Sequence, residues 1–219
     1  MFEKDQIKAI LFYLDGTLMD TDDQTVARLA GWLGKLRWRD PERAARWMVM
    51  TAETPGNAFI TLLDAVGLDR PVRFMANRVS RLWGHRAPAQ FEIIVGVQEM
   101  LAQVGARYRL AVVSTRGRKD SEAFLAQYGL QDLFEVVVTS ESTWRLKPHP
   151  APVLYAAERL GLDPQHCLMV GDTTVDIKSA LRAGAWSVGV LCGFGMRREL
   201  ERVGAHVILD STADLAAIV

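Results

Sequence analysis

The chain has 219 residues, a length that suits one α/β domain with a modest insertion better than two equal domains. Hydrophobic residues make up 49% and charged residues 24%, as in an ordinary globular protein rather than a disordered chain. The 26 basic residues balance the 26 acidic ones, which argues against a protein whose main partner is nucleic acid.

The N-terminal segment leads into an apolar run over residues 9–14. This run is too short to span a bilayer or to form the core of a signal peptide, so we expect no membrane partner. The two cysteines, Cys167 and Cys192, imply no disulfide framework. Together these features predict a cytoplasmic protein with reduced thiols.

Short apolar runs alternate with longer helical stretches along most of the chain. Most of these runs are continuous, as expected when helices cover both faces of a parallel sheet. We predict strands at 8–14, 109–114, 135–139, 167–170, 187–191 and 206–209. Glycines in the left-handed conformation are predicted to close the helices. The candidates are Gly67, Gly129 and Gly161, each followed by leucine, and also Gly105 and Gly184.

The segment from residue 21 to about 86 carries helix signals and no convincing strand. Thr21 to Gln24 form a predicted capping box, and Pro41 and Pro55 each follow a capping residue. Its four tryptophans are expected mostly in the core of a small helical bundle; they are Trp32, Trp38, Trp47 and Trp83. The sequence therefore predicts an α/β doubly wound domain with a helical insertion after the first strand.

Polar residues follow the predicted strands, at the edge where parallel sheets bind ligands. They are Asp15-Gly16-Thr17 after the first strand, Ser114-Thr115 after the second, Lys147-Pro148 between the third and fourth, and Gly171-Asp172 through Asp176 after the fourth. Each motif alone is common, but their joint occurrence in this order is not.

The residue types at these strand ends suit a phosphoryl group. Thr17, Ser114 and Lys147 supply hydroxyl donors and a cation for a phosphate dianion. Asp172 and Asp176 are carboxylates, which Mg²⁺ prefers together with water and phosphate oxygens. They share one face if their segment is helical, because they are four residues apart.

These motifs, together with the run Leu11 to Leu18, resemble the four motifs of the haloacid dehalogenase-like (HAD) superfamily. The similarity is strongest to the phosphoglycolate phosphatase and β-phosphoglucomutase-like group, which carries a helical cap. The resemblance implies a Rossmann-like parallel-sheet core over 1–18 and 90–219, an inserted α-helical cap over 19–89, and Mg²⁺. It also implies hydrolysis of small phosphorylated metabolites through a phosphoaspartyl intermediate.

The resemblance further implies a role for each matching residue. Asp15 becomes the general acid/base and a metal ligand through its backbone carbonyl. Asp172 ligates Mg²⁺, and Asp176 completes the metal site by supporting Asp172 or Lys147. The phosphate group is held by residues from three motifs, namely Gly16, Thr17, Ser114, Thr115 and Lys147.

The sequence departs from the family at one position. The family motif is Asp-x-Asp-Gly-Thr, and here Tyr13 stands where the nucleophilic aspartate belongs. Attack by Asp15 instead requires a move of roughly 6–7 Å along the strand and removes the acid/base. Attack by Tyr13 requires ionising a phenol whose pKa is ordinarily near 10. We therefore expect phosphoaspartyl catalysis to be weak or absent, and metal binding to be weakened.

Four hypotheses remain open at this level. The chain is a phosphatase-type hydrolase with little activity, or a non-catalytic module that binds a phosphorylated metabolite or a partner. The third hypothesis is haloacid dehalogenation, a reaction that needs the same missing aspartate and uses no metal. In the fourth, Tyr13 is an introduced or erroneous change in an ordinary phosphatase.

The substrate and the oligomeric state are not readable from the sequence. Candidates for leaving-group recognition are diffuse within the insertion: Arg43, Arg46, Trp47, Thr54 and Asn57. Arg116 and Arg118 lie beside the second motif and either meet an acidic substrate or, as surface arginines more often do, face solvent.

Overall fold

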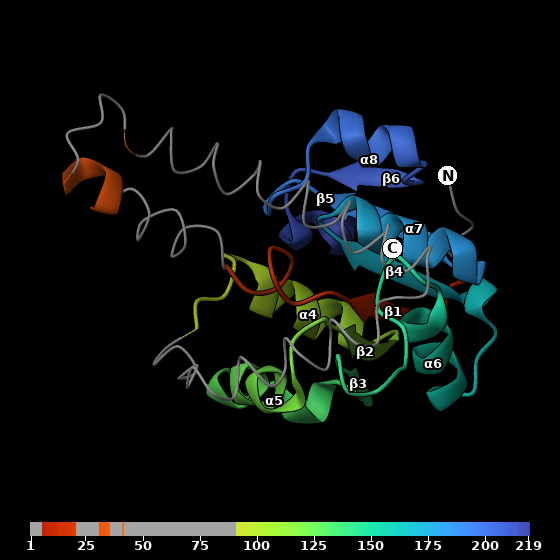
Figure 1. The fold of residues 1–219 in the computed structure, drawn as a ribbon. Helices are drawn as coiled ribbons and strands as arrows, with labels where there is room; N and C mark the ends of the chain where they lie inside the picture. The colour runs from red at the N-terminus through yellow and green to blue at the C-terminus, as the bar shows by residue number, and fades with distance from the viewer. Residues whose placement is uncertain (1–5, 21–30, 36–40, 42–90) are drawn as a thin grey trace. The chain divides into compact units, whose positions relative to one another are not determined.

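The computed structural model describes residues 6–20, 31–35, 41 and 91–219 (Figure 1). The chain divides into two compact units, one formed by Met1–Thr21 with Phe91–Val219 and the other by Asp22–Gln90. Most features predicted for the insertion, including the capping box at Thr21 and the five recognition candidates, lie outside the described residues. Trp32 is described and is 59% exposed, whereas the other three tryptophans of the insertion lie outside the described residues, so the expectation that most of the four are core stays a prediction.

The first unit is built on a six-stranded sheet in which every pairing is parallel. All six predicted strands are confirmed. They are β1 (Ala9–Phe12), β2 (Arg109–Val113), β3 (Val136–Val138), β4 (Cys167–Gly171), β5 (Trp186–Val190) and β6 (Val207–Leu209). Four of them are shorter than predicted, β4 is one residue longer and β5 is shifted by one residue. Their order in the sheet is β3-β2-β1-β4-β5-β6.

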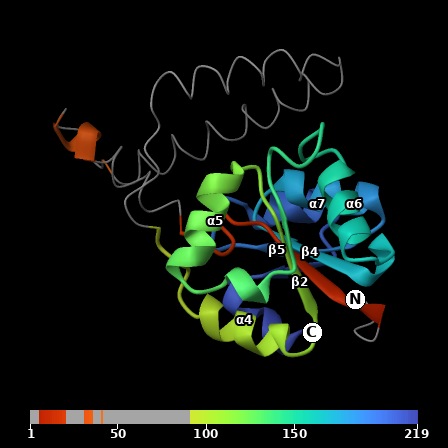
Figure 2. The same cartoon turned by 90° about the horizontal axis from the view of Figure 1, so that it is seen from below.

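Five α-helices of the described residues pack on the two faces of this sheet (Figure 2). They are α4 (Val97–Gly105), α5 (Arg118–Gln127), α6 (Ala151–Arg159), α7 (Thr174–Ala183) and α8 (Arg197–Val203). Three short 3₁₀ helices, η2 (Gln131–Leu133), η3 (Pro164–His166) and η4 (Thr212–Ala217), complete the unit. None of the helices in the described ranges is long and apolar enough to cross a membrane.

The strand residues alternate between two hydrophobic clusters, one on each face. Ile10 and Phe12 of β1 join the cluster formed with α4 and α5, whereas Ala9 and Leu11 join the cluster formed with α6 and α7. Side chains of a strand point to opposite faces in turn, so both faces must be apolar when both are covered. This explains why the strands are continuous apolar runs in the sequence.

Glycines end three helices as the sequence predicts. Gly129 and Gly161 follow the last residues of α5 and α6 with φ of 66° and 62°, and Gly184 caps α7 with φ of 78°. Gly105 differs, since it is the last residue of α4 and its φ is not positive. A Cβ there would lie 2.7 Å from Leu133 Cδ1, the end of a flexible side chain that would have to shift. Gly67 lies outside the described residues.

Candidate functional site

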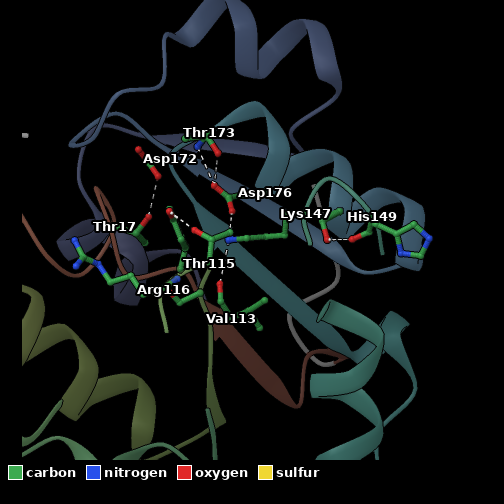
Figure 3. A network of polar contacts seen from close by, with 12 residues as sticks. Thr17, Val113, Thr115, Arg116, Lys147, His149, Asp172, Thr173 and Asp176 are labelled. Carbon is green, nitrogen blue, oxygen red and sulfur yellow. Dashed lines mark hydrogen bonds and ion pairs between the residues drawn. The ribbon is translucent and has the colours of Figure 1, made fainter. Parts of the chain in front are cut away.

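The predicted polar residues gather at the carboxyl ends of β1, β2 and β4 (Figure 3). Here the strand order runs from β1 toward β2 and β3 on one side, and toward β4, β5 and β6 on the other. Such a change of direction leaves a crevice between the connecting loops in open parallel sheets. The loops after the three strands carry Tyr13 to Thr17, Ser114 to Arg116 and Asp172 to Asp176, and Lys147 comes from the loop between β3 and α6.

The loop after β1 turns back tightly on itself. The backbone amides of Thr17, Leu18 and Met19 all donate to the carbonyl of Leu14, at 3.2, 2.9 and 2.8 Å. Gly16 has φ of +64°, and a Cβ on it would lie 2.4 Å from Asp172 Oδ2. Only glycine therefore lets this loop rest directly against Asp172. The Thr17 hydroxyl donates to Asp172 Oδ1 over 3.4 Å, which is a weak hydrogen bond.

Asp172 is fully buried, and the segment after β5 closes over it. The backbone amide of Phe194 donates to Asp172 Oδ2 at 3.0 Å. A side chain on Gly193 or Gly195 would collide with Asp172. Sequence reasoning missed these two glycines. The signal for them was the run Cys192-Gly-Phe-Gly, which directly follows a predicted strand.

Lys147 is engaged in three directions. Its ammonium donates to the Val113 carbonyl at 3.0 Å and to Asp176 Oδ1 at 2.5 Å. It also lies 3.5 Å from the centroid of the Tyr13 ring, which is a cation–π contact. An ammonium has three N–H donors, and its side chain is only 1% exposed. The Lys147 ammonium is therefore buried and already engaged by three protein groups.

Asp176 uses both carboxylate oxygens inside the protein. One accepts from Lys147, and the other accepts from the Thr173 amide at 3.1 Å and the Thr173 hydroxyl at 2.6 Å. These contacts form a capping box at the start of α7. Because α7 begins at Thr174, Asp172 precedes the helix. The expected sharing of one helical face by Asp172 and Asp176 is therefore wrong.

Helix α7 also holds the loop that carries Lys147. Ser179 donates its hydroxyl proton to the His149 carbonyl at 2.8 Å, and Arg182 donates to the Pro148 carbonyl at 2.9 Å. Together with the Lys147–Asp176 pair, these bonds tie three consecutive residues of the loop to one helix. The position of the ammonium is thus determined by α7.

Tyr13 lies at the centre of the charged groups. It follows Ala9 and Leu11 on the α6 and α7 face of β1, and its hydroxyl lies 3.1 Å from Thr115 Oγ1. Burial raises the pKa of this phenol well above its ordinary 10.0, and the negative charges of Asp15, Asp176 and Asp172 raise it further. Tyr13 is therefore a neutral phenol at neutral pH, and a neutral phenol is a poor nucleophile.

Asp15 forms a two-point ion pair with Arg116. Arg116 Nε lies 2.8 and 2.9 Å from the two carboxylate oxygens, and Nη2 lies 2.5 Å from Oδ1. The backbone of Arg116 is fixed separately, because its amide donates to Ser114 Oγ and its carbonyl accepts from the Ser140 amide. A solvated Arg116 was the commoner expectation and is wrong, whereas Arg118 is exposed and contacts Glu122.

The carboxylates present do not fit a Mg²⁺ ion held by the three predicted aspartates. Both carboxylates predicted for the metal already accept hydrogen bonds from protein groups at both oxygens, Asp176 from Lys147 and Thr173, and Asp172 from Thr17 and Phe194. Tyr13 contributes no carboxylate. Across the ranges that the structure describes, no three His, Cys, Asp or Glu side chains form a group able to hold a metal.

The chain is similar to proteins named as hydrolases and phosphatases. The family model described as haloacid dehalogenase-like hydrolase matches residues 10–190. The chain is 27% identical to a phosphoglycolate phosphatase of Escherichia coli strain K12, over 96% of this chain and 92% of that protein. It is 31% identical to the probable phosphatase IndB of Dickeya dadantii, over 94% and 90%.

A solved structure resembles the chain over its whole length. It is a predicted phosphoglycolate phosphatase from Haemophilus somnus, with a TM-score of 0.71, 26% identity and 99% coverage of both chains. The family model covers most of the chain and includes all four segments that carry the site, which follow β1, β2, β3 and β4. The chain belongs to the haloacid dehalogenase-like hydrolase family.

Proposed function

We propose that this chain is a phosphatase-type member of the family that binds the phosphate group of a small phosphorylated metabolite but hydrolyses phosphate monoesters weakly or not at all. The relatives named as phosphatases support the substrate class. The main support for weak activity is the position of the Tyr13 ring, whose centroid lies 3.5 Å from the Lys147 ammonium. A protonated phenol fills the place where the family has its attacking carboxylate.

The second catalytic position supports the same proposal. Asp15, the proposed acid/base, is held by the Arg116 guanidinium at both oxygens. Both of its carboxylate oxygens are thus already engaged by a protein group. This contact favours the alternative reading, in which the chain is a purely non-catalytic binding module.

The proposal includes a weak metal site and a cap. We expect Mg²⁺, which the family resemblance implies, to bind weakly because one carboxylate is absent and those of Asp172 and Asp176 are engaged by protein groups. We also propose that residues 19–89 form the helical cap that the family resemblance implies, since this segment is inserted between the first two strands of the core. Substrate identity is then expected to depend on residues of this cap.

The test replaces the tyrosine by the family carboxylate. The unaltered chain, Tyr13→Asp and Tyr13→Asn are assayed on p-nitrophenyl phosphate with excess Mg²⁺, after thermal unfolding shows that all three are folded. Tyr13→Asn is the matched control, because it has the shape of aspartate without its charge. We expect kcat/KM to rise at least about 100-fold in Tyr13→Asp only, which corresponds to about 2.8 kcal/mol of barrier.

Two results contradict the proposal. Equal activity of the unaltered chain and Tyr13→Asp shows that Tyr13 is not the reason for low activity. A covalent phosphoenzyme trapped by acid quench in the unaltered chain at neutral pH shows that a nucleophile is already present. If no variant is active but inorganic phosphate raises the melting temperature of the native chain, the binding-module alternative is supported.

A further inference from the structure

The two cations that the structure describes in the site differ in how far water reaches them. The Lys147 side chain is 1% exposed, and its ammonium contacts the Val113 carbonyl, the Asp176 carboxylate and the Tyr13 ring. The Arg116 side chain is 24% exposed, and its partner Asp15 is 18% exposed. An anion arriving from solvent therefore meets Arg116 and not Lys147.

The charges of the site require an incoming anion to replace one that is already there. Three carboxylates, Asp15, Asp172 and Asp176, act on Tyr13, which is itself neutral. Two cations, Lys147 and Arg116, oppose them. The described site therefore carries one excess negative charge, and a phosphate dianion added to it is repelled.

Only one of the three carboxylates is placed to leave. Asp176 is fully buried against Lys147 and caps α7. Asp172 is fully buried beneath Gly16, Gly193 and Gly195. Asp15 is partly exposed, and its ion pair with Arg116 lies where solvent enters. A guanidinium fork binds phosphate with the same two-point geometry that it uses for a carboxylate.

We propose that the ligand's phosphate group binds to the Arg116 guanidinium by displacing the Asp15 carboxylate, and that this binding needs no divalent cation. In the ligand-free protein, the Asp15 carboxylate occupies the place on Arg116 that the phosphate group takes on binding. The backbone of Arg116 stays in place, because Ser114 and Ser140 hold it, so only the side-chain partners exchange. The inference rests on the proposed function and adds the side chain that holds the phosphate and its independence of metal.

The test is titration calorimetry of the full chain with inorganic phosphate, once with EDTA and once with excess Mg²⁺. The variants are Arg116→Gln, Asp15→Asn, the double variant, and Arg118→Gln as the matched control on the neighbouring exposed arginine. Each variant is first checked for folding by thermal unfolding.

We expect equal affinity with EDTA and with Mg²⁺. Asp15→Asn should bind phosphate about tenfold more tightly or better, because the internal competitor is gone. Arg116→Gln should bind at least about tenfold more weakly, and Arg118→Gln should be unchanged. In the Arg116→Gln background, Asp15→Asn should have little effect, whereas a general electrostatic effect of Asp15 would persist there.

The outcomes separate the two proposals. Phosphate binding that requires Mg²⁺, that survives Arg116→Gln, or that weakens in Asp15→Asn overturns the exchange at Arg116 and leaves the proposed function standing. No phosphate binding by any variant, with or without Mg²⁺, overturns both.

Discussion

Lys147–Asp176 and Arg116–Asp15 are both ion pairs of the site, yet their surroundings are opposite. The first pair has side chains that are 1% and 0% exposed, and its members also contact the Val113 carbonyl, the Tyr13 ring and the start of α7. The second pair has side chains that are 24% and 18% exposed and joins two loops at the edge of the sheet.

The two ion pairs therefore differ in role: the buried pair stabilises the structure, whereas the partly exposed pair can exchange one partner for a ligand. A buried ion pair costs free energy to remove from water, but the loss of one partner costs more, since the other charge stays buried and unpaired. A pair that water reaches contributes little net stability, so its partner is readily exchanged. The site therefore combines a rigid buried half with a half that is open to ligands.

The largest effect is expected from breaking the buried pair. Lys147→Met leaves Asp176 with an uncompensated charge at full burial and removes the cation from the Tyr13 ring. The free energy of unfolding should fall by about 3–5 kcal/mol, measured by urea denaturation at pH 7. A second substitution, Asp176→Asn in the same chain, removes the stranded charge and keeps a cap for α7. It should restore at least half of the loss, and a loss below about 1 kcal/mol in Lys147→Met contradicts the assignment.

A smaller effect tests the protonation state of Tyr13. Its raised pKa means that the folded protein keeps the phenolic proton at pH values where the unfolded chain has lost it. This contribution to stability is complete below about pH 10 and is lost as pH rises through that value toward the folded pKa. Tyr13→Phe keeps the aromatic ring beside Lys147 but has no phenolic proton, so its stability does not fall with rising pH through this group. At pH 8 it should cost about 1 kcal/mol for the lost contact with Thr115.

The measurement is urea denaturation of both proteins at pH 8, 10 and 11. The stability gap between them should close as the pH rises, because only the native chain loses stability through this group. A native chain with a phenolate already ionised at pH 8, seen as an absorbance band near 295 nm that Tyr13→Phe removes, contradicts the account.

The sequence predicts the fold of the described core well, because its signals are local. Continuous apolar runs give the six strands, and glycines followed by leucine end α5 and α6. The meeting of Thr17, Thr115 and Asp172 follows from topology, since parallel strands bring their carboxyl ends to one edge (Figure 3).

The pairing of charges within the site was not predictable in the same way. Arg116 and Asp15 are 101 residues apart, and their contact depends on the register of β1 and β2 and on the turn at Gly16. The separation of Asp172 from Asp176 depends on where α7 begins, and helix ends are the least certain feature of a sequence pattern. No local sequence pattern indicated that the Lys147 ammonium would contact the Val113 carbonyl and the Tyr13 ring.

The smallest effect is expected from breaking the partly exposed pair, Arg116–Asp15. Arg116→Gln should change the free energy of unfolding by no more than about 1 kcal/mol, because water replaces the lost contacts at Asp15. Arg109→Gln is the matched control, since Arg109 forms a similar two-point pair with Glu135 at the opposite end of β2. Both substitutions should cost little in urea denaturation, and both costs should shrink in 1 M NaCl. Only Arg116→Gln should alter phosphate binding. A loss of several kcal/mol in Arg116→Gln alone would show that this pair is as structural as Lys147–Asp176, and a pair bound that firmly does not exchange Asp15 for a ligand.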